Sequence, residues 1–268
     1  MVSSNFDIKV LDKASEILAF ELNLLELQNQ SRINIPVYLC IGQEYVASTL
    51  ASILEAKNPA IFAQHRSHSY FLAFGGDKKS LLLEIMGDGE KGCARGYGGS
   101  VGIYSKKISM FGHSGIMGEQ GYLGVGYSLA TNRPTIIVFG DATLEEDYIG
   151  PILGFCKLRN LPVLFICEDN GLAILTPTYK RRTWSAKDLA EAYGLDFSEM
   201  DDDPYLIESR LRTYDFSQPL FLNIRVQRKN RHVGAILEGD VAWDRESLFI
   251  KQFVQIHGGK TYQIIRGK

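Results

Sequence analysis

Two side chains that suit a metal site, Asp141 and Asn170, each come just after a segment with the pattern of a buried strand. Asp141 follows segment 135–139 and Asn170 follows segment 163–167. Parallel strands bring their carboxyl ends to the same edge of a sheet. If the two segments are neighbours in one parallel sheet, Asp141 and Asn170 can meet in space although they lie far apart in the sequence.

The chemistry that these residues could support is the binding of a hard divalent cation. A carboxylate, an amide oxygen and a backbone carbonyl such as that of Leu172 are ligands that Mg²⁺ and Ca²⁺ accept, with other positions left for phosphate oxygens. A structural role explains the same residues equally well, with Asp141 capping the next segment and Asn170 forming a turn with Gly171. The residues alone leave both interpretations open.

The elements that must position these side chains form a βαβ unit. Segment 135–139 predicts a strand, 151–159 a helix and 163–167 a second strand, joined by a right-handed crossover. Pro151 fits the first position of the helix, where its missing N–H costs nothing. We therefore expect residues 141–150 to form a loop.

Further elements extend this unit into an α/β fold. A helix is predicted over 12–30, amphipathic at its start and apolar all round later, so it is expected to bury against a larger surface. We also expect helices over 42–56, 204–213 and 243–256, and a strand over 220–226. No repeat, linker or charge break marks a boundary, so the sequence predicts one domain, 1–268, with a doubly wound, mostly parallel sheet and helices on both faces.

Glycine is concentrated between residues 86 and 126, which usually means that backbone approaches a ligand or another chain closely. Segment 87–93 has the glycine spacing of a P-loop, but Cys and Ala stand where Lys and Ser or Thr must reach phosphate and Mg²⁺. Segment 96–102 follows no predicted strand and lacks the regular GxGxxG spacing, which argues against a dinucleotide site. Gly124 lies in a helical run of small residues, where we expect it to serve close packing.

Composition excludes several classes of partner. Lys and Arg number 29 against 31 Asp and Glu, so nothing indicates a nucleic-acid-binding or anionic-membrane surface. The chain has no run of about 18 apolar residues and no export signal in its first residues, and we expect a cytoplasmic protein. The four cysteines match no metal, redox or disulfide pattern and are expected to be buried reduced thiols.

Several short motifs, in one order along the chain, resemble those of a known family. They are Gly42-Gln-Glu, His65-Arg-Ser-His, Gly92-Cys-Ala-Arg-Gly-Tyr-Gly-Gly-Ser, Gly115-Ile-Met-Gly-Glu-Gln, Gly140-Asp-Ala, Leu161-Pro-Val-Leu-Phe-Ile-Cys-Glu-Asp-Asn, and Arg228 with His232. The chain resembles the alpha subunits of the decarboxylating first component of 2-oxo acid dehydrogenase complexes, of the pyruvate, branched-chain and acetoin types. The resemblance covers most of the chain, from about residue 41 to residue 232.

The resemblance implies a thiamine diphosphate cofactor held together with Mg²⁺ in the thiamine diphosphate-binding fold. It places Asp141, Asn170 and the Leu172 carbonyl on Mg²⁺, and it places Arg66 and His232 on the diphosphate oxygens. The remaining cofactor contacts that it implies are His65 in place of an aromatic neighbour, the backbone of Gly115 and Met117 on the aminopyrimidine, and Gly140, Ala142 and Thr143 beside Asp141.

His68 and His232 are the catalytic candidates. His68 could donate a proton to the substrate or contact its carboxylate, and His113 is a further candidate on the same grounds. Structural alternatives exist for each group: a surface ion pair for Arg66, a satisfied structural histidine for His68 and an exposed loop residue for His232. The resemblance favours the cofactor for Arg66 and His232.

The resemblance also implies a partner chain. In that family the glutamate that activates the aminopyrimidine belongs to a separate beta subunit, and we expect no second pyrimidine-binding domain within these 268 residues. The chain alone is therefore expected to be inactive. The expected assembly has two alpha-like and two beta-like chains and acts on a small 2-oxo acid. The glycine-rich middle and the helix over 12–30 are the expected contact surfaces.

Departures from the family pattern keep alternatives open. Ala142 replaces a glycine and Asp169 an asparagine of the metal motif, and 145–147 is an acidic run. The loop after His232 lacks the Ser-rich sequence that supports docking of a lipoyl carrier. The main hypothesis is decarboxylation of a 2-oxo acid with transfer of the acyl unit. The altered loop favours a carboligase or transketolase-like reaction with the same cofactor, and the acidic departures motivate a non-catalytic scaffold that lost the cofactor.

Overall fold

Six parallel strands form the central sheet of the computed structural model, which describes residues 4–234 and 248–267. Across the sheet the strands are β2 (Met110–Phe111), β1 (Ala60–Phe62), β3 (Thr135–Gly140), β4 (Val163–Asp169), β8 (Leu220–Arg225) and β7 (Asp196–Asp201). A separate antiparallel pair consists of β5 (Leu172–Ala173) and β6 (Thr176–Pro177). The chain winds outward in both directions from β1 and β3, so the predicted doubly wound sheet is confirmed. Such a sheet places its ligand crevice where the winding direction changes.

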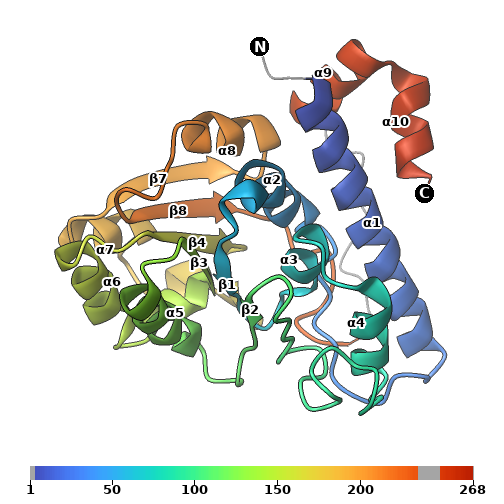
Figure 1. Cartoon of the computed structure of the whole chain (residues 1–268), viewed down its shortest axis with the longest axis horizontal. Helices are drawn as coiled ribbons and strands as arrows, with labels where there is room; N and C mark the ends of the chain where they lie inside the picture. The colour runs from blue at the N-terminus through green and yellow to red at the C-terminus, as the bar shows by residue number, and fades with distance from the viewer. Residues whose placement is uncertain (1–3, 235–247, 268) are drawn as a thin grey trace.

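Helices cover both faces of the sheet because residues along each inner strand alternate between two apolar cores. Ile136 and Val138 of β3 belong to one core, and Ile137 and Phe139 belong to the other. The first core includes residues of α1 (Ser4–Asn29), α2 (Glu44–Leu54), α3 (His68–Ala73), α4 (Lys78–Ile85), α8 (Pro204–Leu211), α9 (Leu248–His257) and α10 (Gly259–Arg266). The second includes residues of α5 (Glu119–Thr131), α6 (Ile149–Leu158) and α7 (Ala186–Ala192). Figure 1 shows α5 and α6 on one side of the sheet and α2 and α8 on the other.

Helix α1 is an internal packing helix. It contacts α2 and α3 along its length, and α9 and α10 pack against it as well (Figure 1). Its apolar positions, among them Leu11, Ile17 and Leu24, are fully buried within the chain. This burial accounts for the apolar positions of the helix within the chain, and the expectation that the helix contacts a partner stays a prediction.

The βαβ unit that was predicted from the sequence is present, with differences at its connection. Residues Asp141–Glu145 form a short 3₁₀ helix rather than a loop, and α6 begins two residues before Pro151. Pro151 still lies in the first turn, where no intrahelical partner for an N–H is needed. The predicted strand over 220–226 is β8, and the helix over 204–213 is α8.

Three strands of the central sheet were not predicted, and neither was the small β5–β6 pair. β1 and β2 have only three and two residues, which is too short for a periodic signal. β7 is an edge strand in which only Met200 is buried, so its sequence DFSEMD is mostly polar. The predicted helix over 243–256 corresponds to α9 from Leu248 onward, and Trp243 lies outside the described residues.

The glycine-rich segment 92–102 is wrapped around a carboxylate of the chain itself. Oε2 of the buried Glu84 accepts hydrogen bonds from the N–H groups of Ala94 (2.8 Å) and Gly96 (2.9 Å). Its Oε1 accepts from Gly98 (2.8 Å) and Gly99 (3.1 Å). The close approach of backbone that the glycines predicted is present here, and its object within the chain is Glu84.

Two smaller predictions can be checked directly. Gly124 packs on the sheet as expected, because a Cβ there would lie 2.7 Å from the Ile137 side chain. All four cysteines are free thiols, and three of them, all except Cys93, are buried. Among the described residues, no helix is long and apolar enough to cross a membrane. The single-domain boundary and the cytoplasmic location stay predictions.

Candidate functional site

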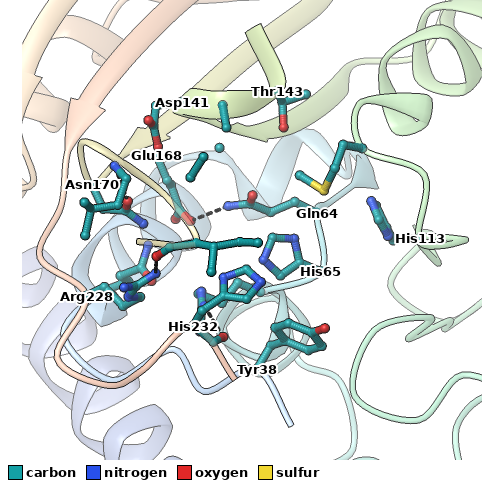
Figure 2. A pocket seen from close by; sticks show the side chains of 18 of the residues that line it. Tyr38, Gln64, His65, His113, Asp141, Thr143, Glu168, Asn170, Arg228 and His232 are labelled. Carbon is teal, nitrogen blue, oxygen red and sulfur yellow. Dashed lines mark hydrogen bonds between the residues drawn. The ribbon is translucent and has the colours of Figure 1, made fainter. Parts of the chain in front are cut away.

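A cavity of about 440 Å³ lies at the carboxyl ends of β1, β3 and β4, where the sheet changes its direction of winding (Figure 2). Gly140 pairs with Glu168 in register, so the residues that follow β3 and β4 start from the same edge. The cavity is lined by every residue predicted for the cofactor and the metal: His65, Arg66, Gly115, Met117, Gly140, Asp141, Ala142, Thr143, Asn170, Leu172 and His232. The sequence therefore located the cavity correctly.

Asp141 stands at the acidic end of the cavity and is nearly fully buried. Its Oδ2 accepts hydrogen bonds from Thr178 Oγ1 (3.0 Å) and from Nη2 of Arg181 (2.5 Å). Burial, and secondly the neighbouring Asp169, raise the pKa of the Asp141 carboxyl, while Thr178 and Arg181 oppose that shift. Arg181 also pairs with Glu145, as does Arg182 at 3.1 Å, so the acidic run after Asp141 is partly neutralised by this chain.

Asn170 and Leu172 complete a set of oxygen atoms beside Asp141. Asn170 Oδ1 accepts the N–H of Leu172 at 3.0 Å across Gly171, which has a positive φ of 72°, so the turn expected from the sequence exists. Asn170 and Leu172 also line the cavity, so the turn is compatible with a place in the metal site. Leu172 is opposite Pro177 in the small β5–β6 pair. Because the Thr178 N–H donates to the Gly171 carbonyl, the Leu172–Pro177 pair is a non-hydrogen-bonded one, and the Leu172 carbonyl points away from β6.

Arg66 forms the basic side of the cavity and is not part of a surface ion pair. Its guanidinium is buried and donates to the backbone carbonyls of Leu39 and His232, each at 2.6 Å. Burial lowers the pKa of Arg66 to about 10, so the group stays charged at neutral pH. Arg228 also lines the cavity and donates to the Ile174 carbonyl at 3.0 Å.

Three histidines and a tyrosine form one wall of the cavity. The ring of His65 lies 5.6 Å from that of His232 and 6.2 Å from that of His113, and Tyr38 packs edge-on against His65 at 4.9 Å. Burial, followed by the charge of Arg66, lowers the pKa of His65 to about 3. Burial is also the main cause that lowers the pKa of His232. These rings are therefore neutral at physiological pH.

His68 is not brought to the cavity. It is fully buried, with Nδ1 2.8 Å from Glu21 Oε1 and Nε2 2.9 Å from Ser100 Oγ. It is absent from the residues that line the cavity. Because both ring nitrogens already have partners inside the protein, this geometry fits the structural alternative and gives no support to contact between His68 and a substrate.

Several residues that line the cavity were not predicted from the sequence: Tyr38, Gln43, Gln64, Glu168 and Ile174. Glu168 is the most unusual, because it is a buried carboxyl group that accepts hydrogen bonds from Tyr70 Oη (2.9 Å) and Gln64 Nε2 (3.2 Å). Burial raises the pKa of Glu168 to about 7. Its place at the end of an otherwise apolar strand was the available signal, since an acidic residue in a buried strand is rare.

The sequence of this chain is similar to that of known proteins. The family model for the dehydrogenase E1 component matches residues 13–204. The chain belongs to this family. It is similar to the pyruvate dehydrogenase E1 component subunit alpha of Rickettsia bellii, with 27% identity over 227 residues, covering 80% of this chain and 68% of that protein. The corresponding subunit of Zymomonas mobilis is 31% identical over 154 residues, which are 56% of this chain and 43% of that one.

A solved structure shares the fold. A transketolase mutant from Pichia stipitis superimposes with a TM-score of 0.61 at 13% identity, covering 99% of this chain and 45% of the transketolase. This chain thus spans less than half of that relative. Together the matches confirm the identification of an alpha-type E1 dehydrogenase chain with a thiamine diphosphate-binding fold.

Proposed function

We propose that this chain is the diphosphate-binding alpha subunit of a thiamine diphosphate- and Mg²⁺-dependent enzyme that decarboxylates a small 2-oxo acid and transfers the acyl unit to an acceptor. The observation that carries the proposal is the meeting of two groups in one cavity. Oxygen ligands gather at Asp141, Asn170 and Leu172, and a buried arginine with neutral histidines stands on the other side. Membership of the E1 dehydrogenase family supports the cofactor.

The residues present fit such a cofactor. A carboxylate, an amide and a backbone carbonyl are the ligand set that Mg²⁺ accepts, and the pairing of β5 with β6 leaves the Leu172 carbonyl pointing away from β6. Thr143 Oγ1 and His65 Nδ1 are buried and have no hydrogen-bond partner in the described part of the chain. Both atoms face a cavity that a diphosphate and its ion would fill, and Arg66 supplies a positive charge beside them.

Thiamine diphosphate, when bound, supplies the electron sink for decarboxylation. The chain's own residues orient the cofactor and neutralise the charge of its diphosphate. Arg66 is fixed by two backbone carbonyls, so it presents its charge without losing side-chain freedom on binding. Glu168, with a pKa of about 7, holds a proton for much of the time near neutral pH and so limits negative charge beside the diphosphate.

A beta-type partner is the second part of the proposal. We infer that it supplies the glutamate that activates the aminopyrimidine, in an assembly of two alpha-type and two beta-type chains. Large apolar side chains are exposed around the cavity, namely Ile116 and Ile174, and nearby Leu175 and Tyr179 are more than half exposed. A partner that buries such side chains gains free energy from their removal from water. The subunit name of the relatives supports a partner of this type.

Calorimetry tests the cofactor site. The chain, purified with its beta-type partner, should bind thiamine diphosphate in the presence of Mg²⁺ and far more weakly in EDTA. The D141A variant should lose the Mg²⁺-dependent part of the affinity, by about 100-fold or more, because the only carboxylate of the ligand set is removed. The matched control D147N removes an exposed charge outside the cavity lining and should bind like the wild type. Unchanged Mg²⁺-dependent binding by D141A would contradict the proposed metal site.

The other hypotheses gain no support from the structure. The altered loop that favoured a carboligase or transketolase-like reaction lies mostly in residues outside the described ranges. The acidic run that motivated a scaffold is partly balanced, since Glu145 pairs with Arg181 and Arg182. Reduction of an artificial electron acceptor with several 2-oxo acids, compared with carboligation of the same acids, separates the two enzymatic hypotheses. Absence of any cofactor binding would favour the scaffold.

A further inference from the structure

His113 has an unusual hydrogen-bonding state for a buried histidine. It lies in segment 112–118, between β2 and α5, lines the cavity and is only 5% exposed. Its Nδ1 accepts the N–H of Gly115 at 2.9 Å. A nitrogen that accepts carries no proton, and in a neutral imidazole the other nitrogen then carries it. The fold therefore sets the tautomer with the proton on Nε2.

The Nε2 atom of His113 is buried, and none of the residues that the structure describes accepts a hydrogen bond from it. Burial lowers the pKa of His113, and the nearby Glu119 opposes this shift only in part. The ring is thus a neutral donor and not a cation at physiological pH. A buried N–H without an acceptor is unfavourable, so its retention beside a cavity indicates that a ligand supplies the acceptor.

His113 lies apart from the groups that would bind negatively charged oxygens. Figure 2 shows His113 across the cavity from Asn170 and Arg228, on the side of His65. Phosphate and carboxylate oxygens favour arginine and a metal ion held by Asp141 and Asn170, because these interactions are charge-assisted. A neutral N–H on the opposite wall suits an uncharged carbonyl oxygen.

We propose that the Nε2–H of His113 donates a hydrogen bond to the keto oxygen of the 2-oxo acid and so positions the substrate in the cavity. This inference rests on the proposed function and adds a substrate contact to it. It predicts selectivity for acids that carry a 2-oxo group, because an acid without that oxygen leaves the donor unpaired.

The test uses the complete complex of the chain with its beta-type partner, loaded with thiamine diphosphate and Mg²⁺. H113A should lower kcat/KM for pyruvate, or for the most active acid of a 2-oxo acid panel, by about 10- to 100-fold. It should weaken inhibition by monomethyl acetylphosphonate, which keeps the keto oxygen, by a similar factor. The affinity for thiamine diphosphate, measured by calorimetry, should change less than about threefold.

Two further variants separate the donor from the shape of the loop. H113N restores a neutral N–H donor and should recover part of the loss. S114A removes a neighbouring hydrogen bond in the same segment, from the Ile116 N–H to Ser114 Oγ, and should behave like the wild type. A drop in thiamine diphosphate affinity as large as the drop in kcat/KM, or wild-type values for H113A, would overturn the inference. If the wild-type complex binds the cofactor but consumes no 2-oxo acid, the proposed function fails and this contact fails with it.

Discussion

Two glycine-rich segments of this chain, 92–102 and 112–118, have similar compositions and opposite roles. The first directs four N–H groups at the Glu84 carboxylate, so its polar groups are paired within the chain. The second lines the cavity and holds a donor, His113 Nε2, that has no acceptor among the residues that the structure describes. Glycine density predicts close approach of backbone, but only unpartnered polar atoms show that the object approached is a ligand.

The two segments are also in contact. A Cβ at Gly112 would lie 2.8 Å from the Gly102 carbonyl oxygen, and one at Gly102 would lie 3.4 Å from the His113 carbonyl oxygen. Segment 92–102, which Glu84 holds in place, therefore packs against segment 112–118 and supports it. Changes in the first segment should act on stability, and changes in the second should act on binding.

The largest expected effect is at Glu84. E84Q keeps the shape but replaces one acceptor oxygen by an NH₂ group, which then faces backbone N–H donors. We expect a loss of about 3 kcal/mol in the free energy of unfolding, because two of the four N–H groups lose their acceptor and face the new NH₂ group instead. Urea denaturation measures it. E90Q, an exposed position in the same region, should cost less than about 0.5 kcal/mol. A cost below about 1 kcal/mol for E84Q would break the comparison.

A pair of alanine substitutions tests the contrast between the segments directly. In G98A the new Cβ would lie 2.3 Å from the Gly102 carbonyl oxygen, so we expect a loss of about 2 kcal/mol in stability. In G115A the Cβ meets nothing within 4 Å, and only the positive φ of 104° opposes it, at about 1 kcal/mol.

The two alanine variants should also differ in binding. Calorimetry should show a larger loss of thiamine diphosphate affinity for G115A than for G98A, provided that the Gly115 backbone contacts the cofactor as proposed. The reverse order, with G98A stable and G115A unfolded, would show that the roles of the segments are exchanged.

The effect that is smallest near neutral pH, and grows only in acid, concerns stability on the cavity side. His65 has a folded-state pKa of about 3, lowered by burial and by the charges of Arg66, His232 and His113. Below a pH of about 6.5 the unfolded chain binds a proton that the folded chain does not, so stability falls as pH decreases. The contribution approaches about 1.4 kcal/mol per pH unit between about pH 6 and pH 4. H65F should remove this contribution, as unfolding at several pH values would show; an identical pH slope would contradict it.

The sequence predicted the inner part of the fold and the cavity well for a common physical reason. β3, β4 and β8 are buried on both faces, so their apolar runs are continuous and easily recognised. The position of Asp141 and Asn170 at one edge of the sheet follows from those strands, because each residue stands just after the carboxyl end of a neighbouring parallel strand. The edge strand β7 and the short β1 and β2 were missed, because their formation depends on pairing with neighbours and not on local pattern.

Contacts between distant side chains were beyond the sequence. His68 and His113 are both buried histidines near conspicuous motifs. No local pattern shows that both ring nitrogens of His68 have partners while Nε2 of His113 has none among the described residues. The partners that decide are distant in sequence for His68, namely Glu21 and Ser100. The ion pair of Arg181 with Asp141 was likewise invisible, since 40 positions separate its members.

The ion pair between Arg181 and Asp141 has a consequence for the order of assembly. A buried carboxylate without a counter-charge would cost several kcal/mol, and Arg181 offsets part of that cost inside the chain. The subunit can therefore reach its folded geometry before a metal ion is available. Arrival of the proposed Mg²⁺ is then an exchange of one positive charge for another, so the ion loads a site that is already folded and does not have to organise it.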